Sequence, residues 1–92
     1  MGKAAPQYAL AHSPAAERDL KSLKKNKTVL KSINKSIAAL AKNPRPAGIE
    51  HLGGAAYRKR DGTYRILYAV DDENQLVTIH RVRDRKEVYK NM

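Results

Sequence analysis

Arginine side chains recur at alternate positions in two stretches of the chain. The stretch YRKRDGTYRILYAV, residues 57–70, carries four cations, namely Arg58, Lys59, Arg60 and Arg65. A later stretch carries three more, Arg81, Arg83 and Arg85. A guanidinium group is planar, permanently charged and able to bind a phosphate through two parallel hydrogen bonds. These residue types therefore indicate a site that binds phosphate groups.

Strand alternation determines which of these cations can act together. Successive side chains of a strand point to opposite faces, so Arg58 and Arg60 share a face. Arg65 can share that face because Asp61-Gly62 is typical of a tight hairpin turn. The later arginines repeat the same spacing, which concentrates guanidinium groups at one end of the predicted sheet.

Tyrosines are interleaved with these arginines, at Tyr57, Tyr64, Tyr68 and Tyr89. A tyrosine ring can stack on an unpaired base, and arginine interleaved with tyrosine on an open sheet face is typical of proteins that bind single-stranded nucleic acid. The alternative is a set of solvated arginines around core tyrosines. The sequence pattern is compatible with both arrangements.

The chain as a whole carries an excess of positive charge. Its 19 Lys and Arg against 9 Asp and Glu give a net charge of +10. Such a domain is expected to associate with an anionic partner, with nucleic acid as the first candidate and an acidic protein as the second. A membrane surface is the third candidate, because no predicted helix combines a strong apolar face with Trp or Phe. The apolar runs are also far shorter than the ~20 residues of a membrane-spanning helix.

The residues that several other kinds of functional site require are missing from the sequence. The chain has no cysteine, which excludes disulfides and thiolate metal sites and is compatible with the cytosol. His12, His51 and His80 are scattered without metal-ligand spacing. Phosphate-loop, dinucleotide and nucleophile-elbow motifs are missing, as are the paired carboxylates of a two-metal nuclease. We therefore expect neither a metal nor a cofactor.

The first half of the chain predicts a strand followed by a helical hairpin. Residues 7–12 alternate weakly, as in a short strand. Ser13 followed by Pro14 is typical of a helix start, and apolar residues at helical spacing extend that helix over 14–25. A very short turn leads to a second, antiparallel helix over 27–42. Its apolar stripe consists of Leu30, Ile33, Ile37 and Leu40.

The second half predicts a loop over residues 44–54 and then three antiparallel strands, over 55–60, 63–71 and 75–82. A charged tail over 84–92 is expected to form a short helix. This order predicts an α+β domain, in which an N-terminal strand and a helical hairpin precede a three-stranded antiparallel meander. The helices pack on one face of the sheet, and the other face stays open to solvent or to a partner.

Two stretches resemble motifs of the RelE/ParE toxin superfamily. Residues 57–68 resemble the family's hairpin, YR-x-R-x-G-x-YR-x-x-Y, and residues 83–89 resemble its C-terminal signature, an arginine followed by a closing EVY. The Asn43-Pro44 loop and the Leu52-Gly53-Gly54 approach to the hairpin also look like the family. The resemblance covers nearly the whole chain and implies one RelE-like toxin domain over residues 1–92.

The resemblance implies the toxin of a type II toxin–antitoxin pair. RelE-type members enter the ribosomal A site and cleave mRNA there without a metal, by attack of a ribose 2′-hydroxyl on the adjacent phosphodiester. The resemblance also implies a cytoplasmic protein whose partners are the ribosome, mRNA and a cognate acidic antitoxin. We expect the free toxin to be a monomer and its complex with the antitoxin to be a hetero-oligomer.

The resemblance assigns catalytic roles to three residues. Arg65 binds the scissile phosphate. Arg85 stabilises the transition state or supports the leaving 5′-oxygen. Tyr89 stacks on the base or helps to activate the 2′-hydroxyl.

The remaining cations are assigned to phosphate binding, namely Arg58, Lys59, Arg60, Arg81 and Arg83. Arg58 and Arg60 depart from relatives that carry lysine there, and an arginine cannot lose its proton to act as a base. The base is then Tyr89 or a group of the ribosome. Asp84 stands where relatives often carry His or Lys, and it either pairs with a nearby arginine or weakens phosphate binding.

Two other functions fit the same sequence. One is a ParE-like toxin that inhibits DNA gyrase without nuclease chemistry, and the other is a non-catalytic RNA-binding module. The tail sequence RDRKEVY favours the nuclease, because a gyrase inhibitor has no need of the pair formed by Arg85 and Tyr89.

Overall fold

The computed structural model describes residues 7–84. In chain order its elements are β1 (Ala9–His12), α1 (Pro14–Ser22), the 3-10 turn η1 (Leu23–Lys25), α2 (Lys27–Lys42), β2 (Glu50–Gly53), β3 (Ala56–Asp61), β4 (Tyr64–Asp71) and β5 (Leu76–Asp84). The strands form a sheet in the order β1-β5-β4-β3-β2. β1 runs parallel to β5, and all other neighbours are antiparallel.

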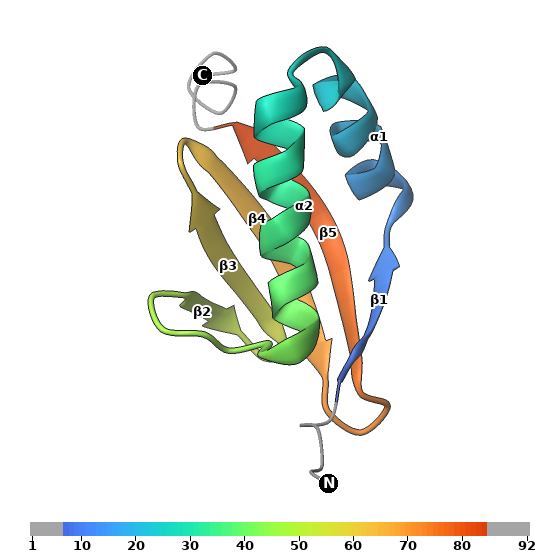
Figure 1. The fold of residues 1–92 in the computed structure, drawn as a ribbon. Helices are drawn as coiled ribbons and strands as arrows, with labels where there is room; N and C mark the ends of the chain where they lie inside the picture. The colour runs from blue at the N-terminus through green and yellow to red at the C-terminus, as the bar shows by residue number, and fades with distance from the viewer. Residues whose placement is uncertain (1–6, 85–92) are drawn as a thin grey trace, which may run out of the picture.

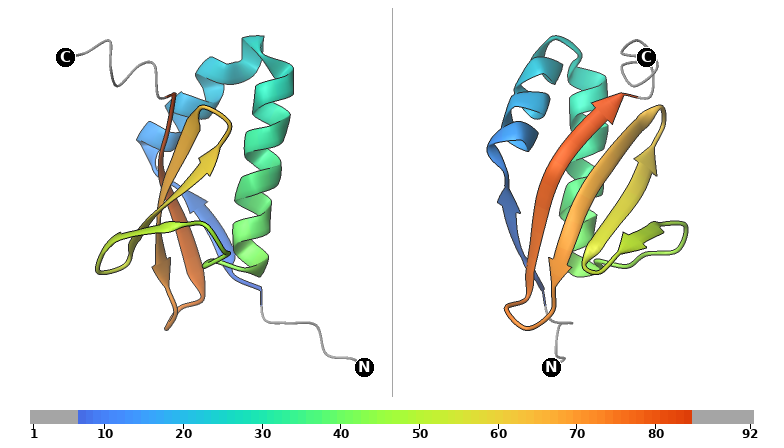
Figure 2. Two further views of the ribbon diagram at one scale, coloured as in Figure 1. Left: turned by 90° about the vertical axis from the view of Figure 1, so that its left-hand side faces the viewer. Right: turned by 180° about the vertical axis from the view of Figure 1, so that it is seen from behind.

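The two helices leave one face of the sheet open. Figure 1 shows α2 lying across one face, with α1 beside the edge of β5. The view from behind in Figure 2 shows the opposite face, which no helix of the described residues covers. We call this the uncovered face. The α+β class and the placement of the helices agree with the sequence prediction.

Local capping explains where the helices begin. The Ser13 side chain accepts a hydrogen bond from the backbone N–H of Ala16 at 3.0 Å, and Pro14 occupies the first turn of α1. Asn26 caps α2 in the same way, through the N–H of Val29 at 3.3 Å. The predicted second helix over 27–42 is confirmed, whereas the predicted first helix ends its α-helical part at Ser22 and continues as η1.

One hydrophobic core fills the space between α2 and the sheet. Most of its large side chains come from three elements, namely Ile33, Ile37 and Leu40 of α2, Ile66, Tyr68 and Val70 of β4, and Val77, Ile79 and Val82 of β5, and Ala16 of α1 and Leu23 of η1 complete it. Fully burying an aliphatic or aromatic side chain contributes roughly 1.5–3 kcal/mol. This core fixes which face of each strand points away from the helices.

A β-bulge changes the alternation of β5. Tyr68 pairs with Ile79 but the preceding Leu67 pairs with Arg81, so His80 is an extra residue on β5. After the bulge Val82 returns to the core. Arg81 and Arg83, on either side of Val82, therefore point to the uncovered face. The local sequence carries no signal for the bulge itself.

The prediction of a plain loop over residues 44–54 is wrong for its last part, because Glu50–Gly53 form β2 at the edge of the sheet. All four residues of β2 are exposed, so no apolar alternation marks them as a strand. Pairing with β3 holds them in place. The predicted tail also begins too early, since Asp84 belongs to β5, and residues 85–92 lie outside the described part of the chain.

Candidate phosphate-binding site

Arginines from three adjacent strands meet on the uncovered face. Arg60 of β3 pairs with Arg65 of β4, which pairs with Arg83 of β5. Opposed residues of antiparallel strands lie on the same face, with their Cβ atoms roughly 5 Å apart. We call these three residues the arginine row. Its members point away from the helices because the next residues, Ile66 and Val82, are buried in the core.

The arginine row lies beside the turn that joins β3 to β4. Gly62 in this turn has φ +62°, a left-handed conformation that glycine adopts without strain. The turn brings Arg60 and Arg65 opposite each other after only four intervening residues. The predicted hairpin and the shared face of Arg60 and Arg65 are confirmed.

The arginine row carries charge that no carboxylate of the described residues neutralises by an ion pair. The three ion pairs of residues 7–84 involve Arg45, Arg58 and Arg81. Three guanidinium groups held side by side repel one another, and that repulsion is relieved when an anion binds between them. The geometry therefore suits a phosphate group.

Two further arginines of the uncovered face are engaged by acids. Arg58 donates to Glu50 Oε1 from Nε at 2.9 Å and from Nη2 at 2.6 Å. Hydrogen bonding from Arg58 lowers the pKa of Glu50, and the charges of Arg60 and Arg65 lower it further. Arg81 is bound by a carboxylate of α1. The structure thus divides the predicted phosphate binders into the arginine row and two arginines with carboxylate partners.

Lys59 is separated from the arginine row. It pairs with Ile66, which is fully buried beneath α2, so Lys59 lies on the helix side of the sheet. Asp84 pairs with Tyr64 one position beyond Arg83, and strand alternation places it on the opposite face from Arg83.

Of the two tyrosine arrangements that the sequence allows, the one on the open face does not hold for the three tyrosines that the structure describes. Tyr68 is buried at 1% exposure, and its hydroxyl donates to the Pro44 carbonyl at 2.6 Å. Burial raises its pKa to about 12. Tyr57 stacks on Tyr68 with ring centroids 5.7 Å apart, and Tyr64 packs against the core. The alternative of core tyrosines is correct here.

Arg85 and Tyr89, two of the three predicted catalytic residues, lie outside residues 7–84. They follow β5, the strand that carries Arg83 in the arginine row. Their roles stay predictions. Among the described residues no group of three or more His, Asp or Glu side chains could hold a metal ion, and no helix is long and apolar enough to cross a membrane.

A hydrogen-bonded cluster that the sequence did not reveal lies at the other end of the sheet. Arg45, in the loop after α2, donates two hydrogen bonds to Asp72 at 3.1 and 2.8 Å and one to the Tyr57 hydroxyl at 2.9 Å. Tyr8 donates to the same Asp72 at 2.6 Å. The cluster ties the chain before β1 and the loop after α2 to the turn between β4 and β5.

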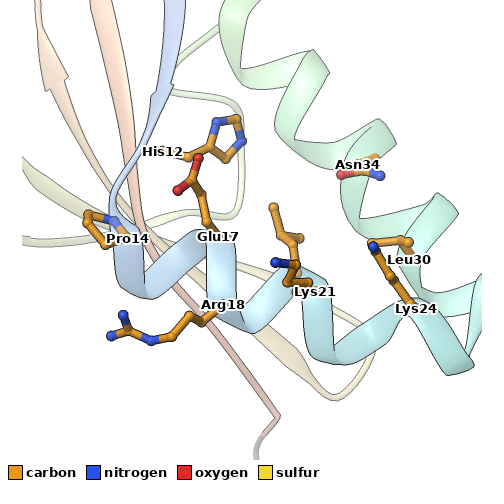
Figure 3. A pocket seen from close by; sticks show the side chains of 9 residues that line it. His12, Pro14, Glu17, Arg18, Lys21, Lys24, Leu30 and Asn34 are labelled. Carbon is orange, nitrogen blue, oxygen red and sulfur yellow. The ribbon is translucent and has the colours of Figure 1, made fainter.

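A groove of about 690 Å³ lies on the helix side of the molecule. Figure 3 shows side chains of α1 and α2 facing each other across it, including Lys21 of α1 and Leu30 of α2. Its lining also contains Arg18, Lys24 and one acidic residue, Glu17. The groove is basic but is separate from the arginine row on the uncovered face.

Comparison with known proteins gives consistent results. A family model described as the ParE toxin of type II toxin–antitoxin systems, parDE, matches residues 10–89. Toxin RelG of Mycobacterium tuberculosis is 29% identical over 85 residues, which are 90% of this chain and 97% of that protein.

Solved structures with the same fold include toxins alone and in complexes. A chain of the toxin–antitoxin complex RelBE2 from Mycobacterium tuberculosis superposes with a TM-score of 0.73 at 29% identity, covering 85% of this chain and 91% of that one. The isolated RelE toxin of E. coli has a TM-score of 0.73 at 26% identity, covering 91% of this chain and 93% of its own.

Proposed function

This chain belongs to the RelE/ParE superfamily of type II toxin–antitoxin toxins, and we propose that it is a ribosome-dependent endoribonuclease that cleaves mRNA in the ribosomal A site. Cleavage inhibits translation. The reaction is independent of metal, as in the RelE-type toxins that its motifs resemble.

The observation that carries this proposal is the arginine row. Three guanidinium groups without an ion pair among residues 7–84 lie on an uncovered sheet face, where a single-stranded RNA backbone has access. The transition state of phosphodiester cleavage carries more negative charge than the substrate, and preorganised cations stabilise that additional charge. Removing one such group typically costs about 10²–10³-fold in rate.

In the proposed reaction the ribose 2′-oxygen forms a bond to phosphorus and the bond from phosphorus to the 5′-oxygen breaks. The products are a 2′,3′-cyclic phosphate and a free 5′-hydroxyl. Arg65, at the centre of the arginine row, binds the scissile phosphate, and Arg60 and Arg83 bind it from either side. Arg85 supports the transition state or the leaving oxygen, and Tyr89 or a group of the ribosome accepts the proton of the 2′-hydroxyl.

An acidic antitoxin is the proposed protein partner. The net charge of +10 suits such a partner, and the similar RelBE2 structure is itself a toxin–antitoxin complex. We propose that the free toxin is a monomer in the cytoplasm and that the antitoxin converts it into a hetero-oligomer.

A second candidate is a gyrase inhibitor without nuclease activity. It is favoured by the matching family model, whose description names ParE. A non-catalytic RNA-binding module is a third candidate, because the arginine row could bind phosphate without cutting it.

Primer extension on a translated message distinguishes these candidates. The wild type, Arg65→Ala and Arg18→Ala are compared with and without ribosomes. Arg18 is exposed on α1, so its variant loses the same charge away from the arginine row. We expect cuts at A-site codons that require ribosomes, survive Arg18→Ala and are lost with Arg65→Ala.

A message left intact by the wild type in every lane would refute the nuclease proposal. A DNA gyrase supercoiling assay would then test the second candidate.

A further inference from the structure

Asp19 of α1 makes three hydrogen bonds to β5, more than 60 residues away in the chain. Its Oδ2 accepts from the backbone N–H of Val82 at 2.8 Å and from Arg81 Nε at 2.9 Å, and its Oδ1 accepts from Arg81 Nη2 at 3.2 Å. The side chain of Asp19 is only 16% exposed. This carboxylate therefore holds the two residues that immediately precede Arg83 of the arginine row.

The edge of β5 needs such a partner at this point. β1 pairs with β5 only as far as His12 opposite Ile79, so beyond Ile79 this side of β5 has no neighbouring strand among the described residues. The β-bulge at His80 interrupts the pairing on the other side. Without Asp19, the Val82 N–H on this edge would have no strand partner among the described residues, and this end of β5 would be held mainly by its pairing with β4 on the other side.

The start of α1 secures the same bulge. The backbone N–H of Ser13 donates to the Ile79 carbonyl at 2.9 Å, and its hydroxyl donates to the His80 carbonyl at 2.8 Å. Ser13 thus binds the bulge itself, and Asp19 binds the residues that follow it. Together they make α1 a support for the part of β5 that leads to Arg83.

Asp19 also acts differently on the two arginines of β5, because it accepts hydrogen bonds from Arg81 and none from Arg83. Burial alone would raise the pKa of Asp19, but hydrogen bonds from Arg81 and Val82 and the charges of Arg81 and Arg83 lower it below its usual value. The carboxylate stays ionised and holds the Arg81 guanidinium against α1. The strand register places Arg83, and not Arg81, opposite Arg65.

We propose that Asp19 is a positioning residue of the arginine row. It fixes the β5 backbone at Val82 and withdraws Arg81, so that Arg83 is held opposite Arg65 in the geometry that binds the scissile phosphate. This role rests on the proposed function, because it concerns the same phosphate site. A displacement of about 1 Å in such a site can reduce a rate by about 10²-fold.

The test is a double-mutant cycle between Asp19→Asn and Arg83→Gln, with Glu17→Gln as the matched control. Asparagine keeps the shape of aspartate but removes its charge. Glu17 is an exposed acid of the same helix. We expect Asp19→Asn to lower kcat/KM of ribosome-dependent cleavage about tenfold. Glu17→Gln should cut like the wild type.

Coupling to Arg83 separates positioning from general stability. In the Arg83→Gln background Asp19→Asn should have almost no further effect on cleavage, although it still lowers the melting temperature in both backgrounds. Independent, multiplicative effects on the rate would overturn the proposal, as would an unchanged rate in Asp19→Asn. If Asp19→Asn melts below the assay temperature, Asp19→Glu replaces it in the cycle, because it keeps the charge and displaces the carboxylate.

A second readout does not require cleavage. Fluorescence anisotropy measures binding of a labelled, fully 2′-O-methylated decaribonucleotide, which cannot be cut because its 2′-oxygens are blocked. We expect Asp19→Asn to weaken binding in the wild-type background and to have no effect in Arg83→Gln. If the wild type cuts no message, the proposed nuclease function fails, and this coupling still decides whether Asp19 positions Arg83.

Discussion

Replacing Arg65 by glutamine should raise the melting temperature of the free protein at low salt. Arg65 lies between Arg60 and Arg83, and none of the three has an ion pair within residues 7–84. Glutamine keeps much of the side-chain length and its hydrogen-bonding capacity but removes the central charge. The free protein then loses two repulsive contacts.

The expected size follows from the strand register. Cβ atoms of opposed residues are roughly 5 Å apart. The guanidinium groups lie at the ends of long side chains, so we take roughly 7 Å between neighbouring charges. Two unit charges at that distance repel by about 0.6 kcal/mol in a water-like dielectric. Two such neighbours amount to about 1 kcal/mol, which corresponds to a shift of roughly 4 °C for a domain of this size.

Thermal melts followed by circular dichroism measure this shift. At about 0.01 M salt the Debye length is about 30 Å, so the repulsion is fully expressed, and at about 1 M it is about 3 Å, so the difference between the proteins should vanish. Arg58→Gln is the control, because Arg58 is paired with Glu50 and its loss should not stabilise the protein.

A lower melting temperature of Arg65→Gln at low salt would contradict an arginine row in which mutual repulsion outweighs the attraction of nearby carboxylates such as Glu50. So would a stabilisation that persists in high salt, or an equal gain in Arg58→Gln. Any of these results would remove the electrostatic basis for anion binding at this site.

Three further predictions concern stability. Tyr68→Phe leaves the Pro44 carbonyl without its 2.6 Å hydrogen bond and should lower the free energy of unfolding in urea by about 1–2 kcal/mol. An unchanged urea midpoint would contradict a buried hydrogen bond. Ser13→Ala removes the N-terminal cap of α1 and should lower the free energy of unfolding by about 1–2 kcal/mol in the same measurement. Hydrogen bonds from Arg45 lower the pKa of Asp72, so its stabilisation is present above the unfolded-state pKa and is lost as pH falls through the lower folded-state pKa. Asp72→Asn should therefore reduce the loss of stability between neutral and acid pH, and acid unfolding curves of unchanged slope would show that the contact makes no contribution.

Features that depend on neighbouring residues could be predicted from the sequence. The start of α1 and the extent of α2 follow from capping residues and an apolar stripe, and the β3–β4 hairpin follows from Asp61-Gly62. The shared face of Arg60 and Arg65 follows from strand alternation across a tight turn. Each of these features is determined within about one helix or one hairpin, where chain geometry leaves few alternatives.

Features that depend on distant residues could not be predicted in this way. β2 carries no apolar pattern and exists through its pairing with β3, and the bulge at His80 appears only in the register with β4. Whether the tyrosines stack on a ligand or fill the core depends on which face α2 covers. For Tyr57 and Tyr68 that face is the core.

The division of the arginines is also a tertiary property. Judged by residue type and alternation alone, every one of them could bind phosphate. In the folded protein, Glu50 binds Arg58 and Asp19 binds Arg81. The sequence therefore determines the residue types and their alternation, which are local. Which cations remain available to a phosphate depends on carboxylates brought from other elements, because ion pairing requires proximity in space rather than in the chain.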